Sequence, residues 1–428
     1  MELKVGYGRV DITPDRSVPL AGLGNTLKRM SETVLDRLLC TCLAFTDEEG
    51  STALLFTSDL IRAMPGIEGA ARKLILEKFG VPEGNIMFAN THTHSATDYL
   101  QAEHPNVQRA AEMLTQKFVE VAGAALADRM PAALYSGCAY PQSLNFVRHY
   151  VRDPETKALV GHPYAPDNQL QLVKIAREGA KDIMIMNWQA HPCFTSGYDK
   201  HDVSADYIHS FREMFEAEND VLFAFFLGAS GDVNARSRIK EEVIAPTRDI
   251  YVEKMRSYIQ EAMNTMRPIP AGAVKVGKKD LTLINDHSDD HRVEDAKIVA
   301  QFWKESYDRK ATDAMAKQYG INSPYHANAI IGRAARGETT EVSIYAASIG
   351  GLGFVFAPYE MFCNNGIFIK KNAPKDVTIV ATCANAGCGY LADDFAFEDQ
   401  CYEVDTRKFE RGTAEKVASA FVELLTQL

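Results

Sequence analysis

Short apolar runs alternate with longer amphipathic segments from one end of the chain to the other. The apolar runs are bounded by polar or turn residues, which is typical of buried strands, and they comprise residues 54–56, 86–88, 183–186, 221–227, 353–356 and 377–380. Apolar residues recur with the period of a helix near residues 67–79, 105–128, 205–218, 247–266, 290–318 and 411–427. This alternation predicts an α/β fold with mixed sheets and flanking helices.

Polar or metal-binding side chains follow five of the predicted strands. In α/β sheets, ligands collect on the loops at the carboxyl ends of the strands. We therefore expect one site, with a metal centre, at these strand ends. The five segments are residues 90–95 (NTHTHS), 187–192 (NWQAHP), 230–234 (SGDVN), 357–360 (APYE) and 385–390 (NAGCGY).

Two histidines in the first of these segments are candidate metal ligands. Side chains alternate along an extended backbone, so His92 and His94 point to the same side and can face one ion. Catalytic zinc takes three protein ligands from His, Glu or Asp and keeps a position open for water. His191 and Glu360, each at another strand end, complete such a set. Each residue alone is equally typical of a structural hydrogen-bonding group, whereas the combination favours a metal centre.

The proposed ligands span most of the chain, which bears on the domain organisation. A site assembled from such distant segments belongs to one folded unit, so we expect a single catalytic domain over residues 1–428. Residues 270–340 are the predicted insertion or lid subdomain. Their charged stretch at residues 286–292 favours a solvated loop, with a lid over the site as the alternative.

Charge and composition narrow the function classes. The net charge of -11 and the pI near 5.5 argue against a nucleic-acid partner, because phosphate binding requires clustered Lys and Arg. No signal peptide pattern and no apolar run of membrane-spanning length are visible, so we expect a cytoplasmic protein without membrane insertion. The eight cysteines show no paired framework and are expected to be reduced. Cys193, Cys388 and Cys401 lie close to candidate site residues, and the sequence leaves open whether they contact a metal and whether the chain forms a homo-oligomer.

Seven short motifs, taken in order, resemble those of the neutral/alkaline non-lysosomal ceramidases and their bacterial homologues. They cover residues 8–14 (GRVDITP), 90–95, 187–192, 204–207 (SADY), 231–234, 357–360, and the pair 389–390 (GY) with 400–403 (QCYE).

The resemblance implies specific roles for residues of this chain. It implies a Zn²⁺ ion held by His92, His191, Glu360 and Tyr390. Tyr402, twelve residues after Tyr390, would stand beside the reacting water, and His94 would lie near the metal as a proton carrier. Asn145 and Arg148 correspond to a further motif of the family, in which the Asn contacts substrate and the Arg supports catalysis.

The chain also departs from the ceramidase pattern. Ceramidases carry a serine in a GDxSP-type motif, and this chain has Asn234 there, followed by Ala235. A serine mechanism at that position is therefore impossible, and we assign Asp232 and Asn234 to substrate binding instead. No immunoglobulin-like domain follows the last motif, so we expect membrane-borne ceramide to be a poor substrate.

Taken together, the sequence predicts a zinc-dependent hydrolase that cleaves an amide, or alternatively an ester, in a small soluble N-acylated substrate. Tyr402 and Arg148 would stabilise the oxyanion, and His94 would carry the proton to the leaving amine. One alternative is a ligand-binding protein that keeps this fold without catalysis. Another is a hydrolase of the metallo-β-lactamase type, although Asp98 follows His94 by four residues and breaks the HxHxDH spacing of that class.

Overall fold

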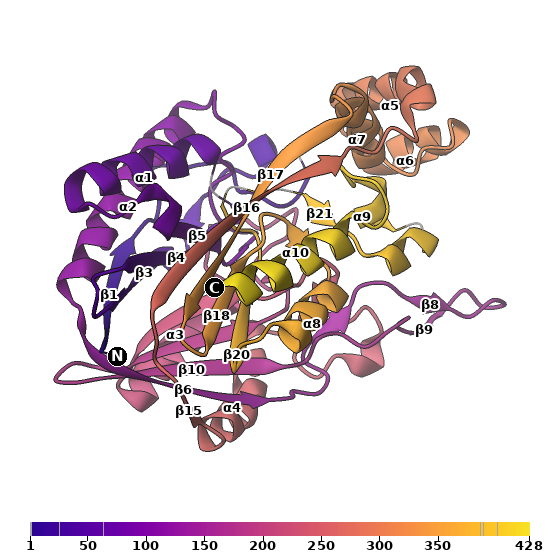
Figure 1. Cartoon of the computed structure of the whole chain (residues 1–428). Coiled ribbons are helices and arrows are strands. Elements are labelled where there is room, and N and C mark those ends of the chain that lie inside the picture. The colour runs from indigo at the N-terminus through magenta and orange to yellow at the C-terminus, as the bar shows by residue number, and fades with distance from the viewer. Residues whose placement is uncertain (1, 25, 63, 386, 388, 400) are drawn as a thin grey trace.

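Two β-sheets lie face to face, and helices cover both outer faces, so that the chain forms four layers (Figure 1). The computed structural model describes residues 2–24, 26–62, 64–385, 387, 389–399 and 401–428. The apolar core between the sheets is built from large side chains of both, with Phe354 of the smaller sheet packed against Phe45 and Phe226 of the larger one. The predicted mixed α/β architecture with flanking helices is confirmed.

The larger sheet is mixed and runs in the order β13-β11-β10-β6-β1-β3-β4-β5, with β15 also paired to β6. Its edge pairs β4–β5 and β11–β13 are parallel, whereas the central pairs are antiparallel. The strands are β1 (Leu3–Asp11), β3 (Leu39–Asp47), β4 (Thr52–Ser58), β5 (Ile86–Asn90), β6 (Met130–Ala139), β10 (Leu170–Arg177), β11 (Ile183–Trp188), β13 (Leu222–Leu227) and β15 (Arg267–Ile269).

The smaller sheet has the order β16-β17-β18-β20, and its last two strands are parallel. Strands β16 and β17 form a long antiparallel ribbon that extends beyond the sheet towards a separate group of helices (Figure 1). The strands are β16 (Val274–Ile284), β17 (Thr339–Ile349), β18 (Leu352–Phe356) and β20 (Val377–Ala381). All six strands predicted from apolar runs are present in the two sheets.

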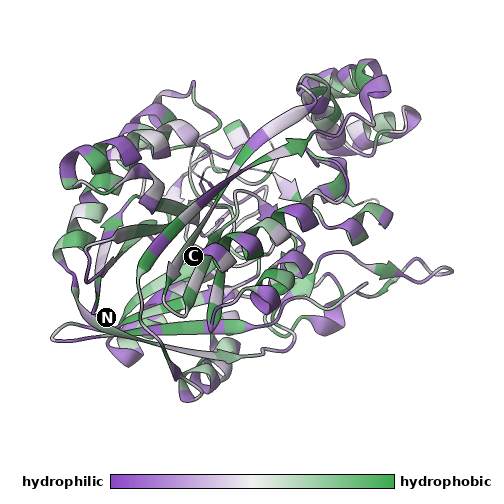
Figure 2. Cartoon of the chain, viewed as in Figure 1, coloured by the Kyte–Doolittle hydropathy of each residue, from purple (hydrophilic) through white to green (hydrophobic). Residues whose placement is uncertain are grey.

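Helices with one apolar face cover the outer surfaces of both sheets. Hydrophobic residues gather on the strands, and polar residues on the outward faces of the helices (Figure 2). Helices α1 (Pro65–Phe79), α2 (Pro105–Ala127), α3 (Tyr207–Asn219) and α4 (Arg248–Asn264) pack on the larger sheet, and α8 (Cys363–Asn372) and α10 (Thr413–Gln427) pack on the smaller one. No helix in the described part of the chain is long and apolar enough to cross a membrane.

A small helical unit stands at the end of the β16–β17 ribbon and has its own apolar cluster. It consists of α5 (Val293–Ser306), α6 (Arg309–Gln318) and α7 (Pro324–Ala334). The single helix predicted over residues 290–318 is therefore wrong, because the chain turns between α5 and α6. Tyr307 ends α5 in the left-handed conformation, with φ of 48°, and the side chain of Asp308 caps α6.

The charged stretch at residues 286–292 anchors this helical unit and is not a solvated loop. Asp286 is 5% exposed and forms an ion pair with Arg407. Asp289 forms an ion pair with Arg333 of α7 at 2.8 Å, and hydrogen bonding to His326 holds the pKa of Asp289 below its usual value. These pairs connect the helical unit to the segment that carries α9 (Tyr402–Asp405).

Short elements fix the loops at the strand ends. Four small ladders pair β2 with β12, β7 with β14, β8 with β9, and β19 with β21. Their bounds are β2 (Thr33–Val34), β7 (Phe146–Val147), β8 (Val151–Arg152), β9 (Leu159–Gly161), β12 (Asp202–Val203), β14 (Val233–Asn234), β19 (Glu360–Met361) and β21 (Tyr390–Leu391). The 3-10 helices are η1 (Thr26–Lys28), η2 (Glu83–Asn85), η3 (Lys240–Glu242), η4 (Asp290–Arg292) and η5 (Asp394–Glu398).

Candidate metal centre and its cavity

The carboxyl ends of strands from both sheets meet at one place. The side-chain amide of Asn90, at the end of β5, donates to the carbonyl of Cys383, which follows β20, at 2.8 Å. The backbone N–H of Thr382 donates to the carbonyl of Leu227, at the end of β13, at 3.0 Å. The loops that carry the candidate metal ligands leave from these ends and converge.

His92 is held by the backbone of the neighbouring loop. Its N–H donates to the carbonyl of Leu60 at 2.8 Å, and its ring Nδ1 lies 3.0 Å from the carbonyl of Ile61. The backbone of His92 is left-handed, with φ of 63°. Strain of this kind costs of order 1–3 kcal/mol and clusters at functional sites. The contact with Ile61 directs Nε2 of His92 inward.

His191 is oriented in the same way from another strand end. Its N–H donates to the carbonyl of Val233 at 2.9 Å, and its Nδ1 lies 2.7 Å from the carbonyl of Ser230. Histidines that bind metals almost always donate their second ring N–H to such a partner, which fixes the tautomer. Both His92 and His191 therefore present Nε2 as the free ligand atom.

The carboxylate of Glu360 lies close to Nε2 of both His92 and His191. Its Oε2 lies 3.3 Å from Nε2 of His92 and 3.2 Å from Nε2 of His191. Burial by itself raises the pKa of Glu360, but the nearby His92 and His191 outweigh burial and hold the pKa well below its usual value. Burial and the positive charge of Arg148 lower the pKa of His191 to about 4. A carboxylate and a neutral imidazole are the forms that bind a metal ion.

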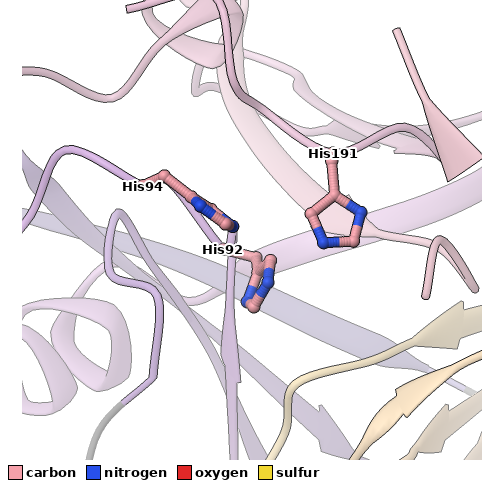
Figure 3. A group of neighbouring side chains, drawn as sticks. All are labelled: His92, His94 and His191. Carbon is pink, nitrogen blue, oxygen red and sulfur yellow. The ribbon is translucent and has the colours of Figure 1, made fainter. Parts of the chain in front are cut away.

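His94 completes a group of three imidazoles (Figure 3). The ring centroid of His94 lies 5.0 Å from that of His92 and 5.5 Å from that of His191. Neither ring nitrogen of His94 has a hydrogen-bond partner among the described residues, although the side chain is buried. Burial, followed by the neighbouring His92 and His191, lowers the pKa of His94 well below its usual value. The lowered pKa favours the neutral form of this ring, which is the form that can bind an ion.

The donor set fits zinc. Two imidazole nitrogens and one carboxylate oxygen converge from separate loops, with both histidines fixed by backbone carbonyls, as in catalytic zinc sites. Tyr390 lies next to this set, because β21 pairs with β19 and places Tyr390 opposite Glu360. The guanidinium carbon of Arg148 lies 5.3 Å from the centroid of the Tyr390 ring.

Arg148 is held beside the metal centre by a buried acid that the sequence did not single out. Its Nε lies 2.6 Å from Oε1 of Glu403, and its backbone N–H donates to the carbonyl of Asp232 at 2.7 Å. The other carboxylate oxygen of Glu403 lies 3.2 Å from Nε2 of His149. Nη2 of Arg148 is buried without a hydrogen-bond partner among the described residues, so this nitrogen is available to a bound molecule.

Tyr402 lies at the start of α9, at the mouth of the site. Its side chain is 46% exposed, and its ring centroid lies 5.8 Å from that of Tyr390 and 5.9 Å from that of Tyr325. Burial of the hydroxyl end, with the negative charge of Glu360, raises the pKa of Tyr402 to about 12. The hydroxyl therefore remains a hydrogen-bond donor at neutral pH.

His92, His94, Glu360, Tyr390, Arg148 and Tyr402 line a cavity of about 840 Å³. The helical unit contributes to its wall through Arg309 of α6 and Tyr325 of α7. The lining residues that carry polar or charged side chains are Thr26, Arg62, His92, His94, Asp98, Gln101, Arg148, Cys193, Ser196, Tyr198, Asn234, Arg309, Tyr325, Glu360, Tyr390, Tyr402 and Thr406. Asp98 is occupied elsewhere, because its carboxylate accepts hydrogen bonds from Thr26 and Gln101.

Of the three residues assigned to substrate binding, the structure brings Asn234 alone to the cavity. The amide of Asn145 donates to the carbonyls of Asp167 and Gln189 at 2.7 and 3.1 Å. The carboxylate of Asp232 accepts from the N–H of Cys363 at 2.8 Å and from the hydroxyl of Tyr164 at 3.0 Å. Asn145 and Asp232 are thus buried supports of the loops, outside the cavity lining.

The three cysteines near the site differ in position. Cys193 lines the cavity, and burial raises the pKa of its thiol to about 12. Cys401 lies with His149 and Glu403 in a second group of potential ligand atoms, all within 4.8 Å of one another. Cys388 is outside the described residues.

Replacing Glu403 with Gln is expected to lower the free energy of unfolding at pH 7 by about 3–5 kcal/mol, because Arg148 is left buried without its counter-charge. The pKa of Glu403 is lowered to about 2, as Arg148 and His149 overcome burial, so its contribution is present above about pH 4.3 and lost as pH falls towards 2. Hydrogen bonds with Cys401 and Glu403 overcome burial and raise the pKa of His149 to about 10. That contribution is present below about pH 6.5 and lost as pH rises through 10.

Urea unfolding of the parent and of Glu403→Gln at pH 5, 7 and 9 tests this expectation. Glu398→Gln is the matched control, because Glu398 pairs with Arg411 on the exposed surface, where an ion pair contributes about 0–1 kcal/mol. Equal stability of Glu403→Gln and Glu398→Gln would contradict the role given to Glu403.

The fold of this chain is similar to those of proteins with solved structures. No family model matches the sequence, and no curated protein matches it. The neutral ceramidase of Pseudomonas aeruginosa superposes with a TM-score of 0.74 over 99% of this chain and 74% of that chain, at 15% sequence identity. A ceramidase complexed with C2 gives a TM-score of 0.73 over 99% of this chain and 75% of that chain, also at 15% identity. The resemblance suggested by the short motifs is confirmed at the level of the fold, and the chain has a neutral ceramidase-like fold.

Proposed function

We propose that this protein is a zinc-dependent hydrolase that cleaves an amide, or an ester, in a small N-acylated substrate. The ceramidase neighbours support a hydrolase of this general kind. The observation that carries the proposal is the convergence of His92, His191 and Glu360 at the strand ends, with both histidines fixed through Nδ1 by backbone carbonyls. Tyr390 is the fourth ligand in this proposal, since it lies opposite Glu360 in the β19–β21 ladder.

The residues around the centre have separate tasks in the reaction. When bound, zinc would supply a Lewis acid that polarises the substrate carbonyl and makes a hydroxide nucleophile available at neutral pH. Arg148 and Tyr402 donate hydrogen bonds to the carbonyl oxygen as negative charge develops on it. His94, whose ring nitrogens have no hydrogen-bond partner among the described residues, carries the proton of the attacking water to the leaving group. Glu403 keeps the guanidinium of Arg148 in place.

The substrate in this proposal is smaller and more polar than ceramide. Ceramidases act on ceramide, an N-acylated lipid, and the shared fold makes an N-acyl bond the first choice. Three arginines, Arg62, Arg148 and Arg309, line the cavity, and they suit a substrate with a polar or charged group near the acyl bond. Asn234 stands in the cavity wall where the ceramidase motif has serine, so the attacking group is water and not a side chain.

Metal analysis combined with hydrolysis assays tests this function. Protein purified without chelator is expected to contain about one zinc per chain and to hydrolyse at least one compound of a panel of small N-acyl amides and esters. Removal of the metal by a chelator is expected to abolish hydrolysis, and added zinc to restore it. Full activity of the metal-free protein would contradict the proposal. Bound zinc without turnover of amides, esters or lactones would favour the ligand-binding alternative.

A further inference from the structure

Arginines surround the proposed catalytic centre. The main cavity meets two neighbouring hollows, of about 930 and 340 Å³, at Asn234, which lines all three. In the described part of the chain, six arginines and no lysine line these spaces: Arg62, Arg148, Arg152, Arg236, Arg238 and Arg309. The chain as a whole carries a net charge of -11, so this concentration of positive charge is local. Four acids among the described residues, Asp98, Glu360, Asp399 and Glu403, line the same spaces, so the arginines outnumber the acids by two. An excess of one sign of charge in a cleft attracts ligands of the opposite sign.

Arg62 is the arginine in the main cavity whose charge is not balanced. Arg148 is paired with Glu403, and Nε of Arg309 donates to both carboxylate oxygens of Asp313, at 2.7 and 2.8 Å. Arg62 forms no ion pair among the described residues, and its Nε is buried without a hydrogen-bond partner there. A buried donor left without a partner costs about 1–3 kcal/mol, and more when it is charged. A bound anion would remove this cost.

Arg62 lines the same cavity as the proposed metal ligands His92 and Glu360. Arg62 directly follows Ile61, whose carbonyl holds the ring of His92, and both Arg62 and His92 line the same cavity. The guanidinium is planar and presents parallel N–H groups that match the two oxygens of a carboxylate. An anion held by Arg62 would share this cavity with the metal centre, which suits a small substrate that carries both an anionic group and the reacting carbonyl.

We propose that the substrate is an N-acyl amino acid and that Arg62 binds its free carboxylate. This inference rests on the proposed function and names its substrate class. In the reaction, water adds its oxygen to the acyl carbon, the C–N bond breaks, and the amine receives a proton. The products are a carboxylic acid and a free amino acid, whose α-carboxylate remains on Arg62 until release. Arg62 takes no part in bond making, bond breaking or proton transfer, and its role is to bind the substrate.

The test compares N-acetylmethionine with its carboxamide, N-acetylmethioninamide, on the zinc-loaded full chain. The parent is expected to prefer the carboxylate by about 10- to 100-fold in kcat/KM, which is the range for a hydrogen-bonded charge pair. In Arg62→Gln this ratio is expected to fall to near one, with the larger loss of kcat/KM on the carboxylate, while the zinc content is unchanged. In Arg62→Lys, which keeps the charge but loses the planar fork, the ratio is expected to lie between these values.

Arg309→Gln is the matched control, because Arg309 lines the same cavity but is already neutralised by Asp313. Its substrate ratio is expected to equal that of the parent. An unchanged ratio in Arg62→Gln, or an equal fall in both Gln variants, would overturn the assignment of the carboxylate to Arg62. If Arg62→Gln loses its zinc, the Arg62→Lys variant is used for the test instead. A ratio of kcat/KM for the two substrates that equals the parent's in Arg62→Lys would then overturn the inference.

Two further outcomes separate this inference from the function on which it rests. Hydrolysis of both compounds by the parent with equal kcat/KM would overturn the inference and leave the hydrolase function intact. Failure of the zinc-loaded parent to hydrolyse any N-acyl amide would contradict the function itself. An N-acetyl aminophosphonic acid is the third substrate, and its faster hydrolysis would assign Arg62 to a phosphate-like group, which also overturns the carboxylate proposal.

Discussion

Replacement of His191 with Ala is expected to remove the bound zinc and to reduce hydrolysis to the level of metal-free protein. His191 supplies one of two imidazole nitrogens that converge on Glu360, and its Nε2 lies 3.2 Å from the carboxylate. Loss of an outer hydrogen-bond partner of a metal ligand already lowers metal affinity by about 10- to 100-fold, so loss of the ligand itself is expected to exceed that range. Elemental analysis after dialysis and a hydrolysis assay measure the two effects.

His201→Ala is the control for this variant. Its ring contacts the carbonyl of Met30 at 3.0 Å, and it does not line the cavity among the described residues. Zinc content and activity of His201→Ala are expected to match those of the parent. Retention of full zinc occupancy in His191→Ala would show that the ligand assignment is wrong.

Replacement of Tyr402 with Phe is expected to lower kcat by about 10²- to 10³-fold with normal zinc content, because one donor to the developing oxyanion is lost. The pKa of Tyr402, raised to about 12 by burial and by Glu360, keeps its hydroxyl protonated for this task. Tyr390→Phe is expected to act differently and to weaken zinc retention, because three protein ligands remain. Zinc stoichiometry and steady-state kinetics on one substrate distinguish the two tyrosines.

Tyr325→Phe serves as the control, because Tyr325 packs against Tyr402 at the mouth of the cavity and is given no part in the reaction. Near-parental kinetics are expected for it. If Tyr402→Phe loses zinc, or turns over like the parent, the oxyanion role is wrong. If Tyr390→Phe binds zinc as tightly as the parent, Tyr390 is a neighbour of the metal and not a ligand.

The six strands that the sequence predicted are buried on both faces, whereas the equally buried β3 and the remaining, partly exposed strands of the two sheets were missed. Strands β18 and β20 lie between the other sheet and helices, so their side chains form continuous apolar runs. Strands β16 and β17 alternate buried and exposed positions over eleven residues, and charged residues interrupt their pattern. The break between α5 and α6 was missed because the apolar period continues through the single left-handed residue Tyr307.

The part of the candidate site that could be predicted from the sequence consists of residues that directly follow predicted strands. His92, His191 and Glu360 stood out as zinc-type ligands, and the structure brings them together. Glu403 and Arg62 were given no role. Glu403 matters through its contact with Arg148, and Arg62 through its lack of a partner among the described residues. Sequence spacing reveals neither. Asn145 and Asp232 were assigned to substrate binding from their motifs. In the structure, Asn145 donates to two backbone carbonyls, and Asp232 accepts from the backbone of Cys363 and the hydroxyl of Tyr164.

The location of the metal is the most direct test of the central claim. Anomalous diffraction at the zinc absorption edge, from crystals of protein purified without chelator, is expected to show one peak about 2.0–2.2 Å from Nε2 of His92, Nε2 of His191 and a carboxylate oxygen of Glu360. A zinc peak at His149, Cys401 and Glu403, with none between His92 and His191, would contradict the proposed catalytic centre.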